Sequence, residues 1–388
     1  MHLLFVTQET GRIPSGVMTV LTELCRNWRE KDRISVLTNR LHWAGEVLLT
    51  QFPRKESFQI HGLPIRLPSE ISYSINALEI DDLWKKAMKA SLRIYTLLQA
   101  LFMIPYLILW LKRESIDAIV SHNGGWPGGE LNRWIVIAGK LAGVSKNFLV
   151  IHNTPAPVRG YAATWNFLRN RIIGFSCTEI LTVSNACRKS LEEGAGFGKI
   201  LRVIHNGVSV DNPSVDTNKT MLLPWQKQYP SIGFIGELHP RKGVHVLLAA
   251  IQQVKSPCEV VLIGNGDSKY MNQLSVQVAS CSHKVHFLGL REDCFSLYRW
   301  FDLVVLPSLN FESFGMVILE AMCFSKPVIC SDFGGMKEVV EHEVTGLVVP
   351  ADDPAALTEA IERLLSDDDL HRKMGIAGRK RLEEYFSS

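Results

Sequence analysis

The chain has 388 residues, of which 46% are hydrophobic and 21% are charged. This balance excludes a disordered protein, and the length suits two domains that each bury a core of their own. The formal net charge of +3 is too small for a general nucleic-acid-binding protein, so an anionic partner must be met by a local group of residues.

Cysteine usage and the N-terminus indicate a cytoplasmic protein. Eight cysteines are scattered along the chain without a Cys-x-x-Cys pair, which favours reduced thiols over a disulfide framework or a zinc site. The chain opens with an apolar run that has no basic region before it, so this run predicts a first strand and not a signal peptide.

Short aliphatic and β-branched runs alternate with helix-length segments along the whole chain. Strands are predicted at 3–6, 34–37, 118–121, 148–152 and 180–183, and again at 232–235, 259–263, 285–288, 303–306, 328–330 and 347–349. A polar stretch at 211–228 separates the two series. The alternation predicts an α/β protein with two doubly wound parallel sheets, one Rossmann-like domain at 1–208 and another at 209–388.

In doubly wound domains ligands bind at the carboxyl ends of the strands. Two such domains in tandem are expected to face a cleft, so the loops that follow strands are the places to search for a site.

One stretch, 94–111, is apolar enough to suggest membrane contact. It is short for a spanning helix and contains Pro105 in its middle, and spanning would split a domain. We expect a helix packed on the domain, with the possibility of peripheral contact at the inner membrane face left open. The expected inward residues are Leu97, Leu98, Leu101 and Ile104, and the expected outward residues are Phe102, Tyr106 and Trp110.

The most informative segment, 306–322, follows a predicted strand and opens a helix near Gly315. A glycine at a helix start lets a phosphate approach backbone N–H groups, and the helix dipole favours its negative charge. Glu320 lies within an otherwise apolar helical stretch, so its carboxylate needs hydrogen-bond donors. These donors are either the ribose hydroxyls of a nucleotide or neighbouring protein groups.

Three further loops follow strands of the same predicted sheet. The first carries Arg241 and Lys242, either of which can grip a diphosphate. The second carries Gly264 and Gly266, and the third ends at Leu290, where backbone groups can meet a base edge. Each loop alone is weak evidence for a ligand site. Together they are stronger evidence, because they are expected at the same edge of the sheet.

The combination of Glu312-Ser-Phe-Gly315 with Glu320, Gly334-Gly335 and the segment 344–350 resembles the retaining glycosyltransferases of family four, which have the GT-B fold. The resemblance runs over about 231–361 and extends loosely into the first half. It implies that Lys242 neutralises the diphosphate, that Glu312 holds hydroxyls of the sugar, and that Glu320 holds the ribose.

The same resemblance places Gly16 near the donor phosphates and His152 against the transferred sugar. It also implies that the leaving phosphate itself deprotonates the acceptor. The predicted catalytic residues are His152, Glu312 and Lys242; the predicted donor-binding residues are Gly16, Arg241, Gly264, Gly266, Leu290, Phe314, Gly315, Met316 and Glu320.

Two positions depart from the family pattern. Ser15-Gly16 stands where the family has two glycines, and Glu237 stands where an arginine is usual. A carboxylate aimed at phosphates would repel them, so Glu237 is expected to point away.

A glycine-rich loop after the strand at 118–121 is expected to line the acceptor pocket, through His122, Asn123 and Trp126. No Asp-x-Asp follows a strand, and the acidic run 367–369 is interpreted as a solvated helix start. These observations predict no bound metal and no cofactor besides the donor.

The sequence therefore predicts a metal-independent retaining glycosyltransferase. It would move a hexose-type sugar from a nucleotide diphosphate sugar to a glycan or lipid-linked acceptor in cell-surface polysaccharide biosynthesis. The alternatives are a nucleotide-sugar epimerase of related fold and a non-catalytic scaffold that binds nucleotide sugars.

Overall fold

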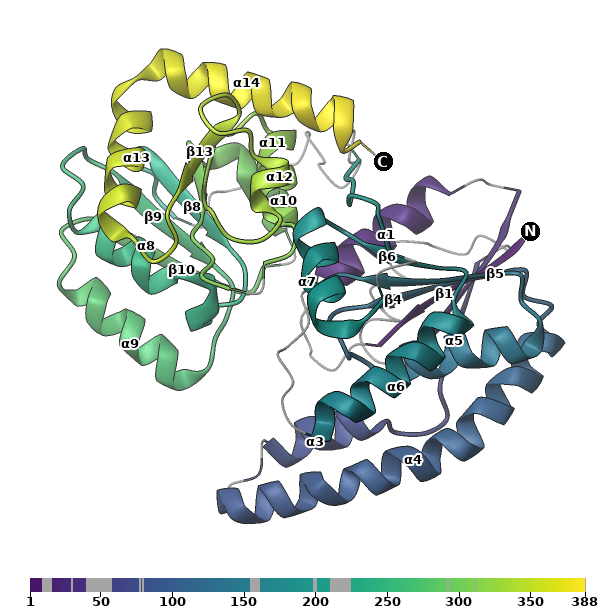
Figure 1. The fold of residues 1–388 in the computed structure, drawn as a ribbon. Helices are drawn as coiled ribbons and strands as arrows, with labels where there is room; N and C mark the ends of the chain where they lie inside the picture. The colour runs from purple at the N-terminus through teal and green to yellow at the C-terminus, as the bar shows by residue number, and fades with distance from the viewer. Residues whose placement is uncertain are drawn as a thin grey trace. The chain divides into compact units, whose positions relative to one another are not determined.

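The structure is a computed structural model that describes residues 1–8, 16–28, 31–39, 58–76, 78, 80–153, 161–197, 201–209, 225–291, 293–310 and 312–387. It divides into two compact units, Met1–Ile204 and His205–Ser388, and each unit has its own sheet (Figure 1). The polar stretch expected between the domains lies outside the described residues from 211 to 224.

The first unit contains a parallel sheet in the order β3-β2-β1-β4-β5-β6-β7. Its strands are β1 (His2–Thr7), β2 (Arg33–Thr38), β3 (Phe58–Gly62), β4 (Ala118–Asn123), β5 (Lys146–Ile151), β6 (Glu179–Thr182) and β7 (Leu201–Val203). Every strand predicted in this half is present, and β3 and β7 were not predicted. The order reverses between β1 and β4, as in doubly wound folds.

Helices cover both faces of this sheet (Figure 1). They are α1 (Gly16–Asn27), α3 (Pro68–Asn76), α4 (Asp82–Arg113), α5 (Glu130–Ala142), α6 (Tyr161–Ser176) and α7 (Asn185–Ala195). Successive strand residues point to opposite faces, so β1 serves both layers. Leu3 and Phe5 join the core under α1, whereas Leu4 and Val6 join the core under α5.

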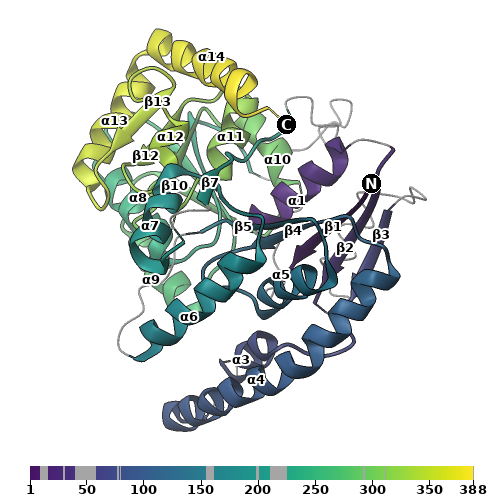
Figure 2. The same cartoon turned by 45° about the vertical axis from the view of Figure 1, so that its right-hand side comes forward.

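Helix α4 is held along a narrow stripe. Met103, Leu107 and Leu111 are buried in the core and are spaced by four residues, which places them on one side of the helix. Gln99 continues the stripe, and its Nε2 donates to the Arg66 carbonyl oxygen at 2.8 Å. The helix packs against α5, and α3 lies beside it in both ribbon views (Figure 1, Figure 2).

The predicted orientation of this helix was wrong at three of its four inward positions. Leu97, Leu98 and Leu101 are 64%, 52% and 70% exposed, and only Ile104 packs against the core. The helix is apolar on almost every side, so its pattern does not select the side that meets α5. The outward prediction is confirmed for Phe102 and Tyr106, which are exposed.

The outward prediction for Trp110 was wrong. Its side chain is half-buried, and its ring centroid lies 5.1 Å from that of His61 on β3. The sequence could not reveal this contact, because β3 itself was not predicted.

The second unit contains a parallel sheet in the order β10-β9-β8-β11-β12-β13. Its strands are β8 (Ser231–Ile235), β9 (Glu259–Ile263), β10 (Lys284–Gly289), β11 (Leu303–Leu306), β12 (Val328–Ser331) and β13 (Gly346–Val349). Its helices are η1 (Pro240–Lys242), α8 (Val244–Ile251), α9 (Ser268–Ala279), α10 (Cys294–Leu297), η2 (Tyr298–Trp300), α11 (Met316–Cys323), α12 (Met336–Val339), α13 (Pro354–Ser366) and α14 (Asp368–Tyr385). All six predicted strands are confirmed.

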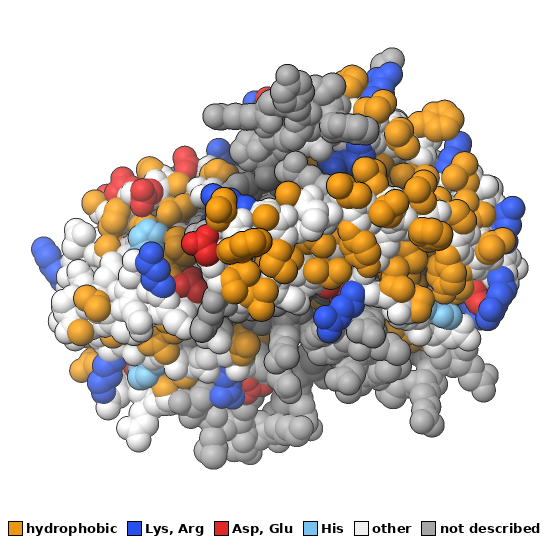
Figure 3. All heavy atoms as spheres, turned by 90° about the horizontal axis from the view of Figure 1, so that it is seen from below, with side chains coloured by type: hydrophobic (Ala, Val, Ile, Leu, Met, Phe, Trp, Pro, Cys, Tyr) orange, Lys and Arg blue, Asp and Glu red, His pale blue; other side chains and the backbone are white. Residues whose placement is uncertain are grey.

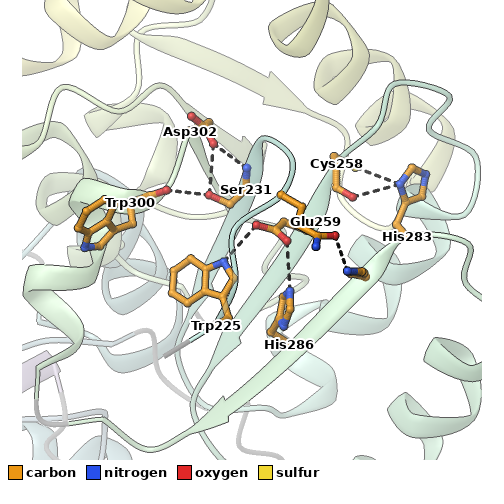
Figure 4. Close-up of polar contacts among 10 residues, drawn as sticks. Trp225, Ser231, Cys258, Glu259, His283, His286, Trp300 and Asp302 are labelled. Carbon is orange, nitrogen blue, oxygen red and sulfur yellow. Dashed lines mark hydrogen bonds and ion pairs between the residues drawn. The ribbon is translucent and has the colours of Figure 1, made fainter. Parts of the chain in front are cut away.

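A buried polar cluster closes the amino end of this second sheet (Figure 4). Trp225 Nε1 donates to Glu259 Oε1 at 3.1 Å, and His286 Nε2 lies 3.3 Å from Glu259 Oε2. The Trp225 ring also stacks on Phe301 at 6.2 Å between centroids. The Glu259 side chain is fully buried, so these partners compensate for the loss of its hydration.

Candidate functional site

The candidate site of the second unit lies at the carboxyl ends of β8 and β11, where the strand order reverses. Lys242 ends the short helix after β8, and Glu312 follows β11. Lys242 Nζ forms an ion pair with Glu312 Oε2, and both side chains are mostly buried, at 16% and 13% exposed. Ser308 Oγ donates to the same carboxylate oxygen at 3.2 Å. The fold thus brings together two of the three predicted catalytic residues.

The backbone of Glu312 is fixed by the loop that follows β12. Gly335 N–H donates to the Glu312 carbonyl oxygen at 3.3 Å. Gly334 has a φ of +62°, and a Cβ atom at this position would lie 1.8 Å from that oxygen. Only glycine permits this approach, so the Gly-Gly pair sets the position of the catalytic candidate.

Gly315 forms the start of helix α11. Its φ of 86° is in the left-handed region, where glycine carries no steric penalty. The first N–H groups of a helix have no acceptor within the helix, and the dipole makes this end positive. The predicted donor residue Met316 is the first residue of α11. The helix start therefore has the chemistry of an anion site.

Glu320 projects from the second turn of α11 and is oriented by a tyrosine. Tyr298 Oη donates to Glu320 Oε2 at 2.7 Å. Burial, together with the charge of Glu320, raises the pKa of Tyr298 well above its ordinary value, so the phenol stays protonated and donates. Because a carboxylate accepts several hydrogen bonds, this contact positions Glu320 and leaves capacity for others.

The remaining predicted donor residues lie at the same edge of the sheet. Arg241 Nη2 pairs with Glu237 Oε2 at 2.7 Å. The charge of Glu237, the residue that departs from the family pattern, is therefore neutralised by an arginine of the same loop. Gly264 and Gly266 follow β9. Leu290 follows β10 and is 54% exposed.

Phe314 is the exception among the donor residues. Its side chain is 3% exposed, and its ring lies 5.6 Å from that of His205 and 5.8 Å from that of Phe386. The side chain therefore anchors the loop, and only the backbone of Phe314 is left for a ligand.

The first unit has its own pair at the reversal between β1 and β4. His122 is the penultimate residue of β4, and His152 follows β5. The Nδ1 atom of His122 lies 2.9 Å from Nε2 of His152, with the rings stacked at 5.2 Å. Burial lowers the pKa of His152 to about 4 and holds that of His122 well below its ordinary value. Both imidazoles are therefore neutral at physiological pH.

The structure buries all three side chains that the sequence assigned to the acceptor side. His122 is 2% exposed and contacts His152. Asn123 is 1% exposed, and its side chain accepts from Gly129 N at 3.2 Å. Trp126 is 5% exposed, and its Nε1 donates to Asn170 Oδ1 at 3.2 Å. The loop folds back on its own unit, so none of these side chains offers a surface to an acceptor.

Gly16, predicted near the donor phosphates, opens α1, the helix that follows β1. Its neighbour Ser15 lies outside the described residues. Gln8, which ends the described part of that loop, was not predicted: its Nε2 donates to Glu130 Oε2 at 2.9 Å.

Within the described ranges, no group of three or more His, Cys, Asp or Glu side chains is arranged to hold a metal ion. The interpretation of the acidic run as a helix start is confirmed, since Asp367 caps α14 by accepting from Leu370 N at 2.9 Å.

Sequence reasoning missed Ser308 and Tyr298, the residues that orient the two glutamates. Ser308 stands four residues before Glu312 in the same loop, and this proximity was the available signal. Tyr298 precedes Glu320 by a whole strand and loop. No local pattern connects a tyrosine and a glutamate across that distance.

Comparison with known proteins identifies a family model that matches the second unit, and relatives of the chain. Residues 221–381 match the family model of glycosyl transferases group 1. The C-terminal unit belongs to the group 1 glycosyltransferases. A phosphatidyl-myo-inositol mannosyltransferase of Mycobacterium leprae is 29% identical over 288 residues, which cover 71% of each chain. The capsular polysaccharide biosynthesis glycosyltransferase CapM of Staphylococcus aureus is 26% identical over 252 residues, 60% of this chain and 63% of CapM.

Solved structures agree with this chain in fold. Anabaena Alr3699/HepE, crystallised with UDP, superposes with a TM-score of 0.71 at 19% identity and covers 100% of this chain and 96% of its own. Sucrose-phosphate synthase of Thermosynechococcus elongatus superposes with a TM-score of 0.67 at 16% identity, covering 100% and 95%. The architecture is GT-B, and the chain is a glycosyltransferase.

Proposed function

We propose that the chain is a metal-independent, retaining hexosyltransferase that uses a nucleotide diphosphate sugar as donor and needs no other cofactor. Its acceptor is a glycan or a lipid-linked glycan of cell-surface polysaccharide biosynthesis, assembled on the cytoplasmic side of the membrane. Family four is the retaining class that this chain resembles most in its Glu312 to Gly315 segment.

The observation that carries the proposal is the ion pair of Lys242 and Glu312 beside the start of α11. A mostly buried cation next to a positive helix end suits a diphosphate, because both stabilise negative charge without reorganising. The carboxylate of Glu312 is held by Lys242 and Ser308, so it is fixed to accept hydrogen bonds from sugar hydroxyls.

The proposed step breaks the bond between the sugar's anomeric carbon and the diphosphate oxygen. That oxygen keeps the bonding electrons and is stabilised by Lys242 and the α11 N–H groups. The acceptor hydroxyl attacks the anomeric carbon from the same face and passes its proton to the departing phosphate. Neutral His152 supports the sugar by hydrogen bonding and does not attack.

The relatives' names support the acceptor class. One relative acts on a phosphatidylinositol lipid, and another serves capsular polysaccharide biosynthesis. The first name contains a lipid and the second a capsular polysaccharide, and the proposal takes the acceptor of this chain from these two classes.

The test compares two substitutions that each remove a carboxylate from an ion pair. Glu312→Gln removes the proposed sugar clamp and should lower kcat/KM for transfer about a hundredfold, in line with the loss of one preorganised polar contact. Glu343→Gln breaks the pair with Arg363 before β13 and should leave transfer unchanged. Thermal melts of both variants report the fold.

A near-normal rate in Glu312→Gln, with the fold intact, would remove the site assignment. Two further assays examine the class of enzyme. The product's anomeric configuration, read by NMR, should match the donor's, and a chelator should leave the rate unchanged.

A further inference from the structure

Helix α4 exposes a broad hydrophobic surface on the side away from its buried stripe. We call this the α4 apolar face; its members are Leu83, Trp84, Met88, Ile94, Tyr95, Leu97, Leu98, Leu101, Phe102, Tyr106 and Leu109. Seen from below, hydrophobic side chains gather on this side of the molecule, with Lys and Arg around them (Figure 3). Leu101, Phe102 and Leu109 are each at least 70% exposed.

This surface is large for a soluble protein. Soluble proteins scatter single exposed apolar residues, whereas a continuous patch along one helix marks a binding surface. The residues from Leu83 to Arg113 form a helix long and apolar enough to cross a membrane, and 22% of its most apolar window is buried. Since the opposite stripe packs on α5, only the outer side of α4 is open to a partner.

Charge identifies the partner. Apart from Asp82, its first residue, α4 contains no Asp or Glu. Lys86 lies near one end, and Lys112 and Arg113 lie at the other, all exposed. A helix with an apolar face and cationic ends suits a bilayer with anionic headgroups, where the apolar side chains enter the acyl boundary and the cations meet the lipid phosphates.

We propose that the α4 apolar face docks the first unit onto an anionic lipid bilayer, with α4 lying in the plane of the interface. A second copy of the chain fits this surface less well. Two copies packed through α4 would bring the cationic helix ends together, whether the helices run parallel or antiparallel. Glu114, the carboxylate that follows the helix, is already paired with Arg113 and Arg33 of its own chain.

Docking through α4 follows from the surface of this helix and does not depend on the proposed transfer reaction. It gives a physical reason for a lipid-linked acceptor, because such an acceptor is confined to the surface on which the enzyme would lie. Binding to lipid and transfer of sugar are measured separately, so each can fail without the other.

The experiment measures sedimentation of the full chain with vesicles of phosphatidylcholine alone and with vesicles containing phosphatidylglycerol. Binding is expected to the anionic vesicles and to weaken with salt. Leu101→Gln/Phe102→Gln removes two exposed side chains without adding charge and should weaken binding at least about tenfold. The matched control, Val276→Gln/Ile376→Gln, changes exposed apolar residues on α9 and α14 and should bind like the wild type.

Lys112→Gln/Arg113→Gln tests the electrostatic part, since each cation near an anionic surface contributes about fivefold in affinity. This variant should bind less to the vesicles that contain phosphatidylglycerol, and its behaviour with phosphatidylcholine vesicles should not change. Equal binding by the wild type and the Leu101→Gln/Phe102→Gln variant would overturn the proposal. A second contradicting result would be a wild-type dimer in light scattering that Leu101→Gln/Phe102→Gln converts to monomer without a change in vesicle binding. Transfer to a water-soluble acceptor should be unchanged in every variant.

Discussion

The two sheets carry different pairs of side chains at the same topological position, one neutral and one charged. Where the first sheet reverses, His122 and His152 form a stacked pair that burial keeps neutral. Where the second reverses, Lys242 and Glu312 form an ion pair that Ser308 supports. The shared fold supplies the position, and the residues placed there decide the chemistry.

The difference suggests a division of labour between the units. Charged groups suit a ligand that is itself charged, and the diphosphate of a donor is such a ligand. Neutral imidazoles suit the hydroxyl groups of a sugar, which exchange hydrogen bonds without a net charge. Substitutions can test this difference between the units at either pair, or at a third place that has no proposed role in transfer.

The largest effect is expected from breaking the neutral pair. His152→Ala should lower kcat for transfer about a hundredfold, because a positioned hydrogen-bonding group at the sugar is lost. Steady-state kinetics measure the change, and a melt checks the fold. If KM rose while kcat stayed constant, His152 would serve binding alone.

A smaller effect, on stability alone, is expected at the amino end of the second sheet. Trp225→Phe removes the donor to buried Glu259 while keeping a ring over Phe301. The free energy of unfolding should fall by about 2 kcal/mol, as for hydrogen bonds to charged groups. Denaturant unfolding measures this loss. Slower transfer at unchanged stability would show that the two ends of the sheet are not functionally distinct.

The smallest effect concerns pH. In the folded chain, burial lowers the pKa of His152 from the ordinary 6.5 to about 4. Between these two pH values the unfolded chain binds a proton at this residue and the folded chain does not. The contribution of this group to stability is therefore complete above the unfolded pKa, and it is lost as the pH falls towards the folded pKa. Between about pH 7 and pH 5 the wild type should lose about 1.8 kcal/mol from this group. His152→Asn should lose less over the same range, and an identical loss would assign the effect elsewhere.

Much of the fold was predictable because strands and glycine turns have local signals. The β-branched runs located the main strands, and the segment around Gly315 located the site edge of the second unit. Strand β7 was missed because three residues are too short for a pattern, and β3 because its residues are only partly buried.

Sequence and structure differ where a tertiary contact decides whether a side chain is buried or exposed. Trp126 was expected to line the acceptor pocket because it stands in a glycine-rich loop after a strand, yet Asn170 and Phe197 enclose it. Leu101 was expected to pack inward, but helix α4 is apolar on most sides, so its pattern does not select the side that meets α5. Neither outcome depends on the residue's own neighbours in sequence, so a single sequence does not contain it.

The most direct test separates the roles of the charged pair by isothermal calorimetry. UDP, GDP and ADP are screened first, and the tightest nucleotide is titrated into Lys242→Ala and Glu312→Gln. Lys242→Ala should bind it at least about tenfold more weakly, since one charge-assisted contact to the diphosphate is lost. Glu312→Gln should bind it like the wild type, because its partner is the sugar, which a free nucleotide lacks. Wild-type affinity in Lys242→Ala would contradict the account.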